Sequence, residues 1–143
     1  MERALAAARE AMRAGDVPVG ALVVSPAGDV LSCAGNRVER DGDPTAHAEV
    51  LALRLACGRQ GSPRLPGDVL VVTLEPCLMC VGAMAHARIS GVVFGAYDVR
   101  AGALSSQTDH VDLPLGGCAM WHLGGVLADP CAAVLRRFFQ KRR

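Results

Sequence analysis

The sequence lacks a long apolar run near its start. Charged residues, among them Arg3, Arg9 and Arg13, interrupt the first twenty positions, which makes this segment too polar for a signal peptide or a membrane span. Low-complexity stretches and internal repeats are also missing. These absences exclude secretory, membrane-embedded and repeat classes, and we expect a cytoplasmic protein without a membrane partner.

Aromatic residues are scarce, at 3% of the chain. Side chains on which nucleobases could stack are therefore few, with Tyr97 and Trp121 as extra candidates. The chain also has little excess charge, because its net charge is +1, and such a total neither requires nor excludes a polyanionic partner.

The basic residues are unevenly distributed. Five of them fall within the last eight positions: Arg136, Arg137, Lys141, Arg142 and Arg143. Such a cluster can contact phosphates. It is equally typical of the solvated end of a helix, where cations offset the helix dipole.

What is present suits one compact domain. The 143 residues are 51% hydrophobic, which is enough for a single core, and we expect one domain over 1–143. The six cysteines occur without an export signal, so they are expected to be reduced thiols, as a metal site requires, and not a disulfide framework.

Hydrophobic periodicity and turn residues predict an α/β fold. The expected helices cover 2–14, a segment N-capped by Thr45 and ending at Ala56, 77–87 and 129–141; the expected strands cover 19–24, 30–34, 69–74 and 92–94. Residues 98–124 show no clean period and predict a long loop with short elements. Helices packed on a mixed sheet follow from this order, with the first two strands forming an antiparallel hairpin.

Two motifs predict a metal site. His47 and Glu49 open one expected helix, and Cys77 and Cys80 open another. Thiols three positions apart on a first helical turn can point at one ion, and the positive end of the helix lowers their pKa. Nitrogen and sulfur donors favour zinc over magnesium or calcium.

The metal site is expected to be open. Structural zinc sites usually have four protein ligands, whereas catalytic sites keep a position for water, and these motifs supply only His47, Cys77 and Cys80. Zinc brings the pKa of bound water close to neutral, so hydroxide becomes available as a nucleophile. Glu49 lies beside the ligands and can carry the proton. His-x-Glu followed by Pro-Cys-x-x-Cys is the signature of zinc nucleobase deaminases.

The other cysteines and histidines have no comparable partners nearby. We assign no role to these residues: Cys33, Cys57, Cys118, Cys131, His86, His110 and His122. Such cysteines are usually small buried hydrophobes, and isolated histidines are usually packing or surface residues.

Beyond the metal motif, the chain resembles the bacterial tRNA adenosine deaminases, which convert the wobble adenosine to inosine. The resemblance spans almost the whole sequence. It is carried by 17–21, Asn36-Arg37, 43–49, 73–80, 82–84, 86–89, 92–96 and Phe138-Phe139.

The resemblance implies a three-layer α/β/α cytidine-deaminase-like fold, with helices on both faces of a mixed five-stranded sheet. It also implies a homodimer with one Zn²⁺ per subunit and a tRNA anticodon loop as partner, its target base flipped into the zinc pocket. The chemistry would be attack on C6 of adenosine with Glu49 as proton shuttle.

Further site residues are implied by the same resemblance. Asn36 would hydrogen-bond the base, the Ala48 backbone N–H would lie near the water and the base, and Val17 would form a pocket wall. Asp98 would contact the backbone of the target nucleotide. Phe138 and Phe139 would lie near flanking bases, although packing in the core or at a dimer interface is an equally good reading for at least one of them.

Two segments depart from the family pattern, and alternatives stay open. Val99–Ser106 keeps only part of a glycine-rich run, and Gly117-Cys118-Ala119 replaces Asn-His-Arg before the last strand. The nearest alternative is a deaminase of a free base or nucleoside, such as guanine or cytosine. A non-catalytic zinc-scaffold subunit would be expected to lose Glu49, and a purely structural zinc domain would need a fourth ligand.

Overall fold

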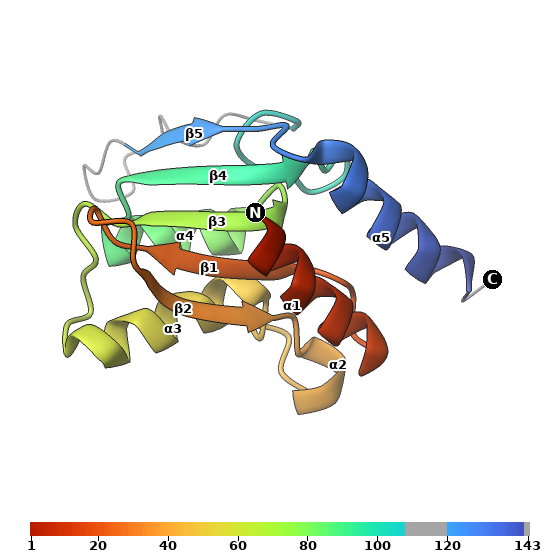
Figure 1. The fold of residues 1–143 in the computed structure, drawn as a ribbon, viewed down its shortest axis with the longest axis horizontal. Coiled ribbons are helices and arrows are strands. Elements are labelled where there is room, and N and C mark those ends of the chain that lie inside the picture. Colours follow the sequence, from red (N-terminus) through yellow and green to blue (C-terminus); the bar gives the residue numbers. More distant parts are fainter. Residues whose placement is uncertain (108–119, 142–143) are drawn as a thin grey trace.

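A computed structural model describes residues 1–107 and 120–141 of the chain. The elements in chain order are α1 (Glu2–Arg13), β1 (Gly20–Val24), β2 (Val30–Gly35), α2 (Val38–Asp41), α3 (Ala48–Gln60), β3 (Val69–Leu74), α4 (Leu78–Ala87), β4 (Gly91–Ala96), β5 (Trp121–Leu123) and α5 (Ala128–Gln140). The strands form one mixed sheet in the order β2-β1-β3-β4-β5 (Figure 1). β1 is antiparallel to both β2 and β3, whereas β3, β4 and β5 run parallel.

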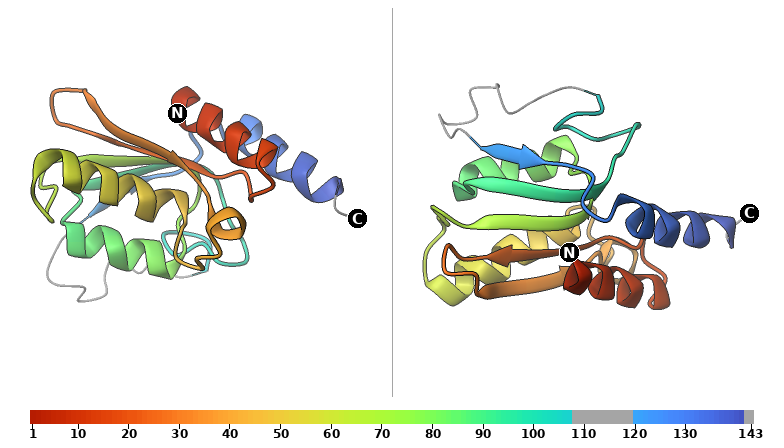
Figure 2. Two further views of the ribbon diagram at one scale, coloured as in Figure 1. Left: turned by 90° about the horizontal axis from the view of Figure 1, so that it is seen from below. Right: turned by 45° about the horizontal axis from the view of Figure 1, so that its top comes forward.

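Helices cover both faces of this sheet. Figure 2 shows α3 and α4 on one face and α1 and α5 on the other. The predicted three-layer α/β/α architecture with a five-stranded mixed sheet is therefore confirmed. Among the described residues, no helix combines the length and the hydropathy needed to cross a bilayer.

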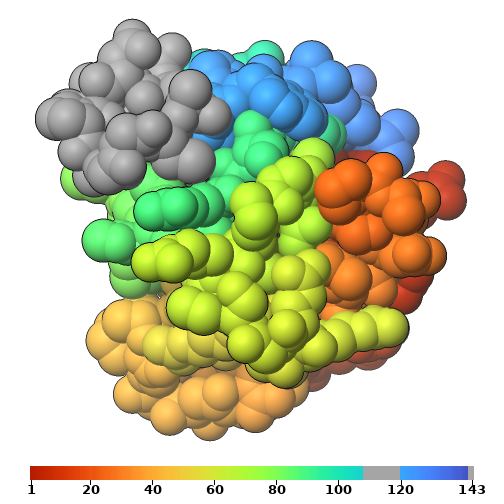
Figure 3. Space-filling model, turned by 90° about the vertical axis from the view of Figure 1, so that its left-hand side faces the viewer, coloured from red at the N-terminus to blue at the C-terminus, as the bar shows by residue number. Residues whose placement is uncertain are grey.

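The main core lies between the sheet and the layer formed by α3 and α4. β3 is apolar on both faces: Leu70 and Val72 point into this core, while Val71 faces the α1 side. Such a run is typical of a central strand with helices on both faces. The segment that follows α3 covers the end of the sheet that lies away from the N-termini of α3 and α4. Figure 3 shows this segment in yellow-green, and its Leu65 is fully buried.

On the other face, α1 packs unusually close to the hairpin. A Cβ atom at Gly20 would lie 2.0 Å from the Ala4 carbonyl oxygen, and one at Gly35 would lie 2.7 Å from that of Ala7. α1 presents small alanines to these glycines. This close packing fixes α1 against the start of β1 and the end of β2.

The structure corrects one predicted cap and adds two elements. Thr45 does not cap α3: its N–H and hydroxyl both donate to Asp43, and His47 occupies the N-cap position. Periodicity predicted neither the short helix α2 nor the position of the edge strand β5, because four and three residues are too few to show a period, although the family resemblance implied a fifth strand. The departure at Gly117–Ala119 and the residues His110, Arg142 and Arg143 lie outside the described residues.

Candidate metal centre and active site

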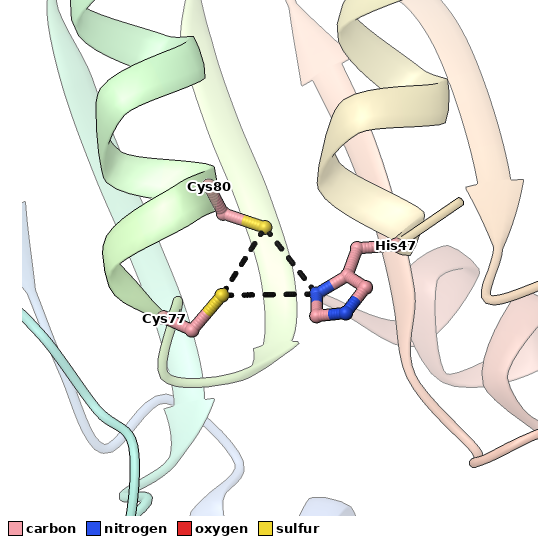
Figure 4. A group of neighbouring side chains, drawn as sticks. All are labelled: His47, Cys77 and Cys80. Carbon is pink, nitrogen blue, oxygen red and sulfur yellow. Dashed lines mark hydrogen bonds between the residues drawn. The ribbon is translucent and has the colours of Figure 1, made fainter. Parts of the chain in front are cut away.

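The N-termini of α3 and α4 meet at the end of the sheet where β3 finishes. His47 is the N-cap of α3 and Cys77 is the N-cap of α4, both with extended backbone, and Cys80 lies one turn into α4. Figure 4 shows the His47 ring and the two thiols pointing at one another from these helices. Sequence positions thirty residues apart are therefore brought to one point by adjacent helix ends.

The spacing of the three donor atoms fits a tetrahedral zinc ion. The Sγ atoms of Cys77 and Cys80 lie 3.8 Å apart, and the Nδ1 atom of His47 lies 3.7 Å from the first and 3.5 Å from the second. With Zn–S of about 2.3 Å and Zn–N of about 2.0–2.1 Å, tetrahedral angles place two sulfurs ~3.8 Å apart and sulfur and nitrogen ~3.6 Å apart. The residues form three corners of such a site, and within the described residues this is the one group of three or more metal-ligating side chains so close together.

The pKa values of the two thiols shift in opposite directions before a metal binds. The contact with the Cys80 thiol lowers the pKa of Cys77 to about 4, with a further contribution from the His47 contact. The same thiol contact and burial raise the pKa of Cys80. A metal that takes both sulfurs as thiolates must therefore displace the thiol proton of Cys80, whose pKa is raised.

Glu49 lies beside the metal ligands without being one of them. It is the second residue of α3, is 4% exposed, and lines the same cavity as His47 and Cys77. Burial raises its pKa, although its own backbone N–H and the charge of His47 act in the opposite direction. A carboxyl whose pKa is raised toward neutrality is suited to proton transfer.

The cavity holds a specific set of the predicted residues. Its volume is about 240 Å³, below the roughly 300–1,000 Å³ of pockets for drug-sized ligands, so it suits one small ring system. Asn36, Val17 and Asp98 line it together with His47 and Glu49. Ala48 is buried as the first residue of α3, where helix N–H groups lack partners within the helix.

A fully buried carboxylate fixes one wall of the cavity. Asp16 accepts hydrogen bonds from the backbone N–H groups of Glu39 (2.8 Å) and Arg40 (3.3 Å), and from the Arg40 side chain at 3.2 Å. It thereby holds α2, whose first residues line the cavity beside Asn36. Sequence reasoning missed the role of Asp16. The one signal for it was its position directly before Val17, where the family resemblance begins.

The two C-terminal phenylalanines have different environments. Phe138 is 5% exposed, whereas Phe139 is 52% exposed; their rings make an edge-to-face contact at 5.3 Å. Phe139 lines a groove of about 720 Å³ with Tyr97 and Arg100. This groove shares Val17, Leu74, Asp98 and Ala101 with the cavity, so the two adjoin one another.

The remaining candidates lie elsewhere. Trp121 sits on the edge strand, with its indole against Gly91 at the far end of β4 from the cavity. Of the cysteines without an assigned role, Cys33 is exposed, Cys57 is half-buried and Cys131 is buried. Arg136, Arg137 and Lys141 are exposed on α5.

Comparison with known proteins agrees with this site. The family model for the cytidine and deoxycytidylate deaminase zinc-binding region matches residues 1–96, which include all three metal ligands and Glu49. The chain belongs to this deaminase family. Its predicted zinc cofactor is supported by both the family and the donor geometry.

Relatives within this deaminase family fall into two groups by length. The chain is 42% identical over 143 residues to a tRNA-specific adenosine deaminase of Haemophilus influenzae, covering all of this chain and 83% of that one. It is 45% identical over 143 residues to a tRNA(Ile)-lysidine synthase of Deinococcus deserti, again over all of this chain. The deaminase chain spans only 27% of that longer relative.

The fold is similar to those of solved tRNA:A34 deaminase and guanine deaminase structures. A structure from studies of A-to-I editing by tRNA:A34 deaminases superposes with a TM-score of 0.90 at 41% identity, covering 94% of this chain and 97% of that one. A guanine deaminase from Nitrosomonas europaea gives a TM-score of 0.78 at 25% identity, covering 96% and 81%.

Proposed function

We propose that the chain catalyses the hydrolytic deamination of adenosine to inosine at the wobble position of tRNA. The observation that carries this proposal is the cavity, in which Asn36, Val17 and Asp98 lie with the metal ligand His47 and with Glu49. A relative that is a tRNA-specific adenosine deaminase, and a similar structure from studies of tRNA:A34 deaminases, support the same substrate.

The reaction consumes water and releases ammonia, so a proton must move twice. His47, Cys77 and Cys80 would hold zinc, which supplies a water nucleophile at neutral pH by lowering its pKa. Glu49 is the shuttle: its carboxylate takes one proton from water and delivers it to the ring nitrogen as the C6–O bond forms. It then carries the second proton, from the hydroxyl added at C6, to the amine, and the C6–N bond breaks to release ammonia and leave the C6 carbonyl.

The other cavity residues hold the base. The Asn36 side chain, 6% exposed and offering both donor and acceptor atoms, hydrogen-bonds the base edge. Val17 forms an apolar wall, and the Ala48 N–H at the start of α3 lies ready to donate. The buried surroundings exclude water from these contacts, which strengthens each of them.

The groove that adjoins the cavity suits an extended RNA rather than a free base. Asp98 is placed between cavity and groove and contacts the nucleotide backbone, while Phe139 lies along the groove and contacts a flanking base. Phe138 supports Phe139 from within the fold. The exposed Arg136 and Arg137 can meet phosphates of the same strand.

We further propose that residues 1–143 act as one deaminase domain and that two copies associate as a homodimer. Exposed apolar side chains on α3 and α4, at Leu55, Leu78 and Met79, offer a surface for the second copy. Some relatives are about four times longer than this chain. We therefore propose the deaminase activity for residues 1–143 and for any longer protein that contains them.

Deamination of a free base is the second candidate, because the guanine deaminase fold is similar and the cavity itself is base-sized. The zinc-loaded protein should be offered an arginine tRNA with a wobble adenosine and, in parallel, free guanine, cytosine and adenosine. Inosine in the tRNA supports the proposal. Rapid ammonia release from a free base, with no inosine in the tRNA, would favour the second candidate.

Activity without any partner protein also separates an enzyme from a non-catalytic scaffold. Glu49 and the three metal ligands lie close together in the structure. Catalysis requires this arrangement, whereas a non-catalytic subunit would not need Glu49. A purified chain that binds zinc but needs another deaminase for turnover would contradict the assignment.

A further inference from the structure

Glu75 gathers an unusual number of hydrogen bonds from a single loop. Its Oε1 accepts the backbone N–H groups of Leu104 (3.2 Å), Ser105 (2.8 Å) and Ser106 (2.9 Å). Its Oε2 accepts the backbone N–H of Asp98 at 3.0 Å and the hydroxyl of Ser106. One carboxylate, 2% exposed, therefore closes both ends of the loop 98–106.

The loop is also attached to the metal-bearing segment directly beside Glu75. Gly102 pairs with Cys77 in an isolated antiparallel bridge, and the Ala103 N–H donates to the Pro76 carbonyl oxygen at 2.9 Å. The segment that follows β3 thus binds the loop in two ways, through the Glu75 carboxylate and through the backbone of Pro76 and Cys77. Both lie within two residues of a metal ligand.

The fit between Glu75 and the loop leaves no spare space. A Cβ atom at Gly102 would lie 2.3 Å from Cδ of Glu75 and 2.6 Å from the Asp98 carbonyl oxygen. Because both neighbours are held by hydrogen bonds, neither can move away cheaply. The loop passes over the carboxylate in one arrangement.

This arrangement decides where Asp98 and Ala101 lie. Both line the cavity, and both line the adjoining groove as well. Asp98 is doubly fixed: its N–H is held by Glu75, and its own carboxylate accepts the Arg100 and Ala101 N–H groups at 2.9 and 3.3 Å. Glu75 borders the same cavity, but both of its carboxylate oxygens accept hydrogen bonds from the loop, so it controls a wall of the substrate site through the loop.

We propose that Glu75 is a positioning residue for substrate binding: it locks the loop 98–106 to the metal-bearing segment and so sets Asp98 at the junction of cavity and groove. Glu75 itself does not transfer a proton. A residue with only a structural role would change stability alone, whereas this role predicts a change in KM for RNA with zinc binding intact.

The decisive variant is Glu75→Gln, which keeps the size of the side chain. Its amide oxygen can still accept the three N–H groups at Leu104, Ser105 and Ser106, but its amide nitrogen then faces the Asp98 N–H, donor against donor. The opposite amide orientation would set the nitrogen against three donors. Gln therefore releases the Asp98 end while it preserves the other end of the loop.

Two readouts follow, of which the first needs no activity. In hydrogen–deuterium exchange, the peptide containing Asp98 should exchange at least about tenfold faster in Glu75→Gln, since a charge-assisted hydrogen bond is lost. In steady-state kinetics with an anticodon stem-loop RNA, KM should rise about tenfold with kcat changed less than about threefold. Zinc content should stay at one per chain.

Asp68→Asn is the matched control. Asp68 is also 2% exposed and lies directly before β3, at the end opposite Glu75, where it accepts from the Gln60 side chain at 3.0 Å. This variant also converts a buried carboxyl to an amide, so it should show any general loss of stability without the rise in KM. Ser106→Ala, which removes one donor only, is the fallback if Glu75→Gln does not fold, and it should raise KM in the same direction.

The kinetic readout rests on the proposed function, and the two can fail separately. If the wild-type chain makes no inosine in RNA, the proposed function fails while the exchange experiment still tests the loop. If the wild type is active and Glu75→Gln has unchanged KM and unchanged exchange at Asp98, the positioning role of Glu75 is overturned. Loss of zinc together with activity would also overturn it, because Glu75 would then serve the metal site.

Discussion

The adjacent residues Phe138 and Phe139 give the sharpest contrast between folding and substrate binding. They share a helix and touch one another at 5.3 Å, yet one side chain is 5% exposed and the other 52% exposed. Phe138→Ala and Phe139→Ala remove the same atoms at neighbouring positions. We expect the first variant to damage stability and the second to damage RNA binding.

The magnitudes follow from burial. Removing a buried Phe side chain typically costs about 3 kcal/mol, which for a chain of this size lowers Tm by ~10 °C. Phe139→Ala loses the edge-to-face contact, worth about 0.5–1.5 kcal/mol, and the contacts of a side chain that is only partly buried, so it costs less than Phe138→Ala. A base stacked on Phe139 would contribute about 1–3 kcal/mol, so its loss should raise KM for RNA about tenfold.

Thermal unfolding and steady-state kinetics on an anticodon stem-loop separate the two effects. Phe139→Leu is the control, because it retains apolar surface but no aromatic face, and it should show most of the KM effect. If Phe138→Ala alone raised KM, or if Phe139→Ala lowered Tm by ~10 °C without changing KM, the assignment of these residues would be refuted.

Three further perturbations test the site and the fold. Glu49→Gln should retain one zinc per chain by metal analysis and lower kcat by about 10²–10⁴, because it removes the proton carrier without removing a ligand; loss of metal would contradict the shuttle role. Cys80→Ala should lose zinc and melt at a lower temperature, since metal binding and folding are coupled; full zinc occupancy would show that the three-ligand site is wrong. Gly20→Ala should cost about 2–3 kcal/mol in chemical denaturation, because its Cβ would lie 2.0 Å from the Ala4 carbonyl oxygen; an unchanged midpoint would contradict the close packing of α1.

The chemistry of the site could be predicted from sequence because its residues form local motifs. His47 with Glu49 and Cys77 with Cys80 each sit within one turn at a helix N-terminus, and helix starts are signalled by loops and Pro residues before them. An α/β layer arrangement was enough to predict that the N-termini of α3 and α4 lie side by side. Zinc and the fold followed from these signals together with the family resemblance.

The walls of the cavity depend on contacts between distant parts of the chain, which periodicity does not record. Asp16 holds α2 from 23 residues away, and Glu75 holds Ser106 from 31 residues away. Both are acidic residues in short connections between a helix and a strand, where sequence alone suggests a solvated surface. Their burial becomes visible only when the backbone donors they satisfy are in place.

The error at Thr45 has a related cause. Thr is a common N-cap, but Asp43 lies two residues earlier and accepts both the Thr45 N–H and its hydroxyl. This Asx turn leaves His47 at the cap position with its ring free to face the two thiols. A capping preference was thus overridden by a local turn that serves the metal site.

Site-resolved detection of inosine tests the proposed deamination of the wobble adenosine most directly. The zinc-loaded chain should be incubated with an anticodon stem-loop that carries adenosine at the wobble position, and the RNA should then be digested and analysed by mass spectrometry, with Glu49→Gln as the inactive control. We expect one inosine at the wobble position, matched by one equivalent of ammonia and absent with the variant. An RNA left unchanged by a fully metallated wild-type chain would contradict the proposal.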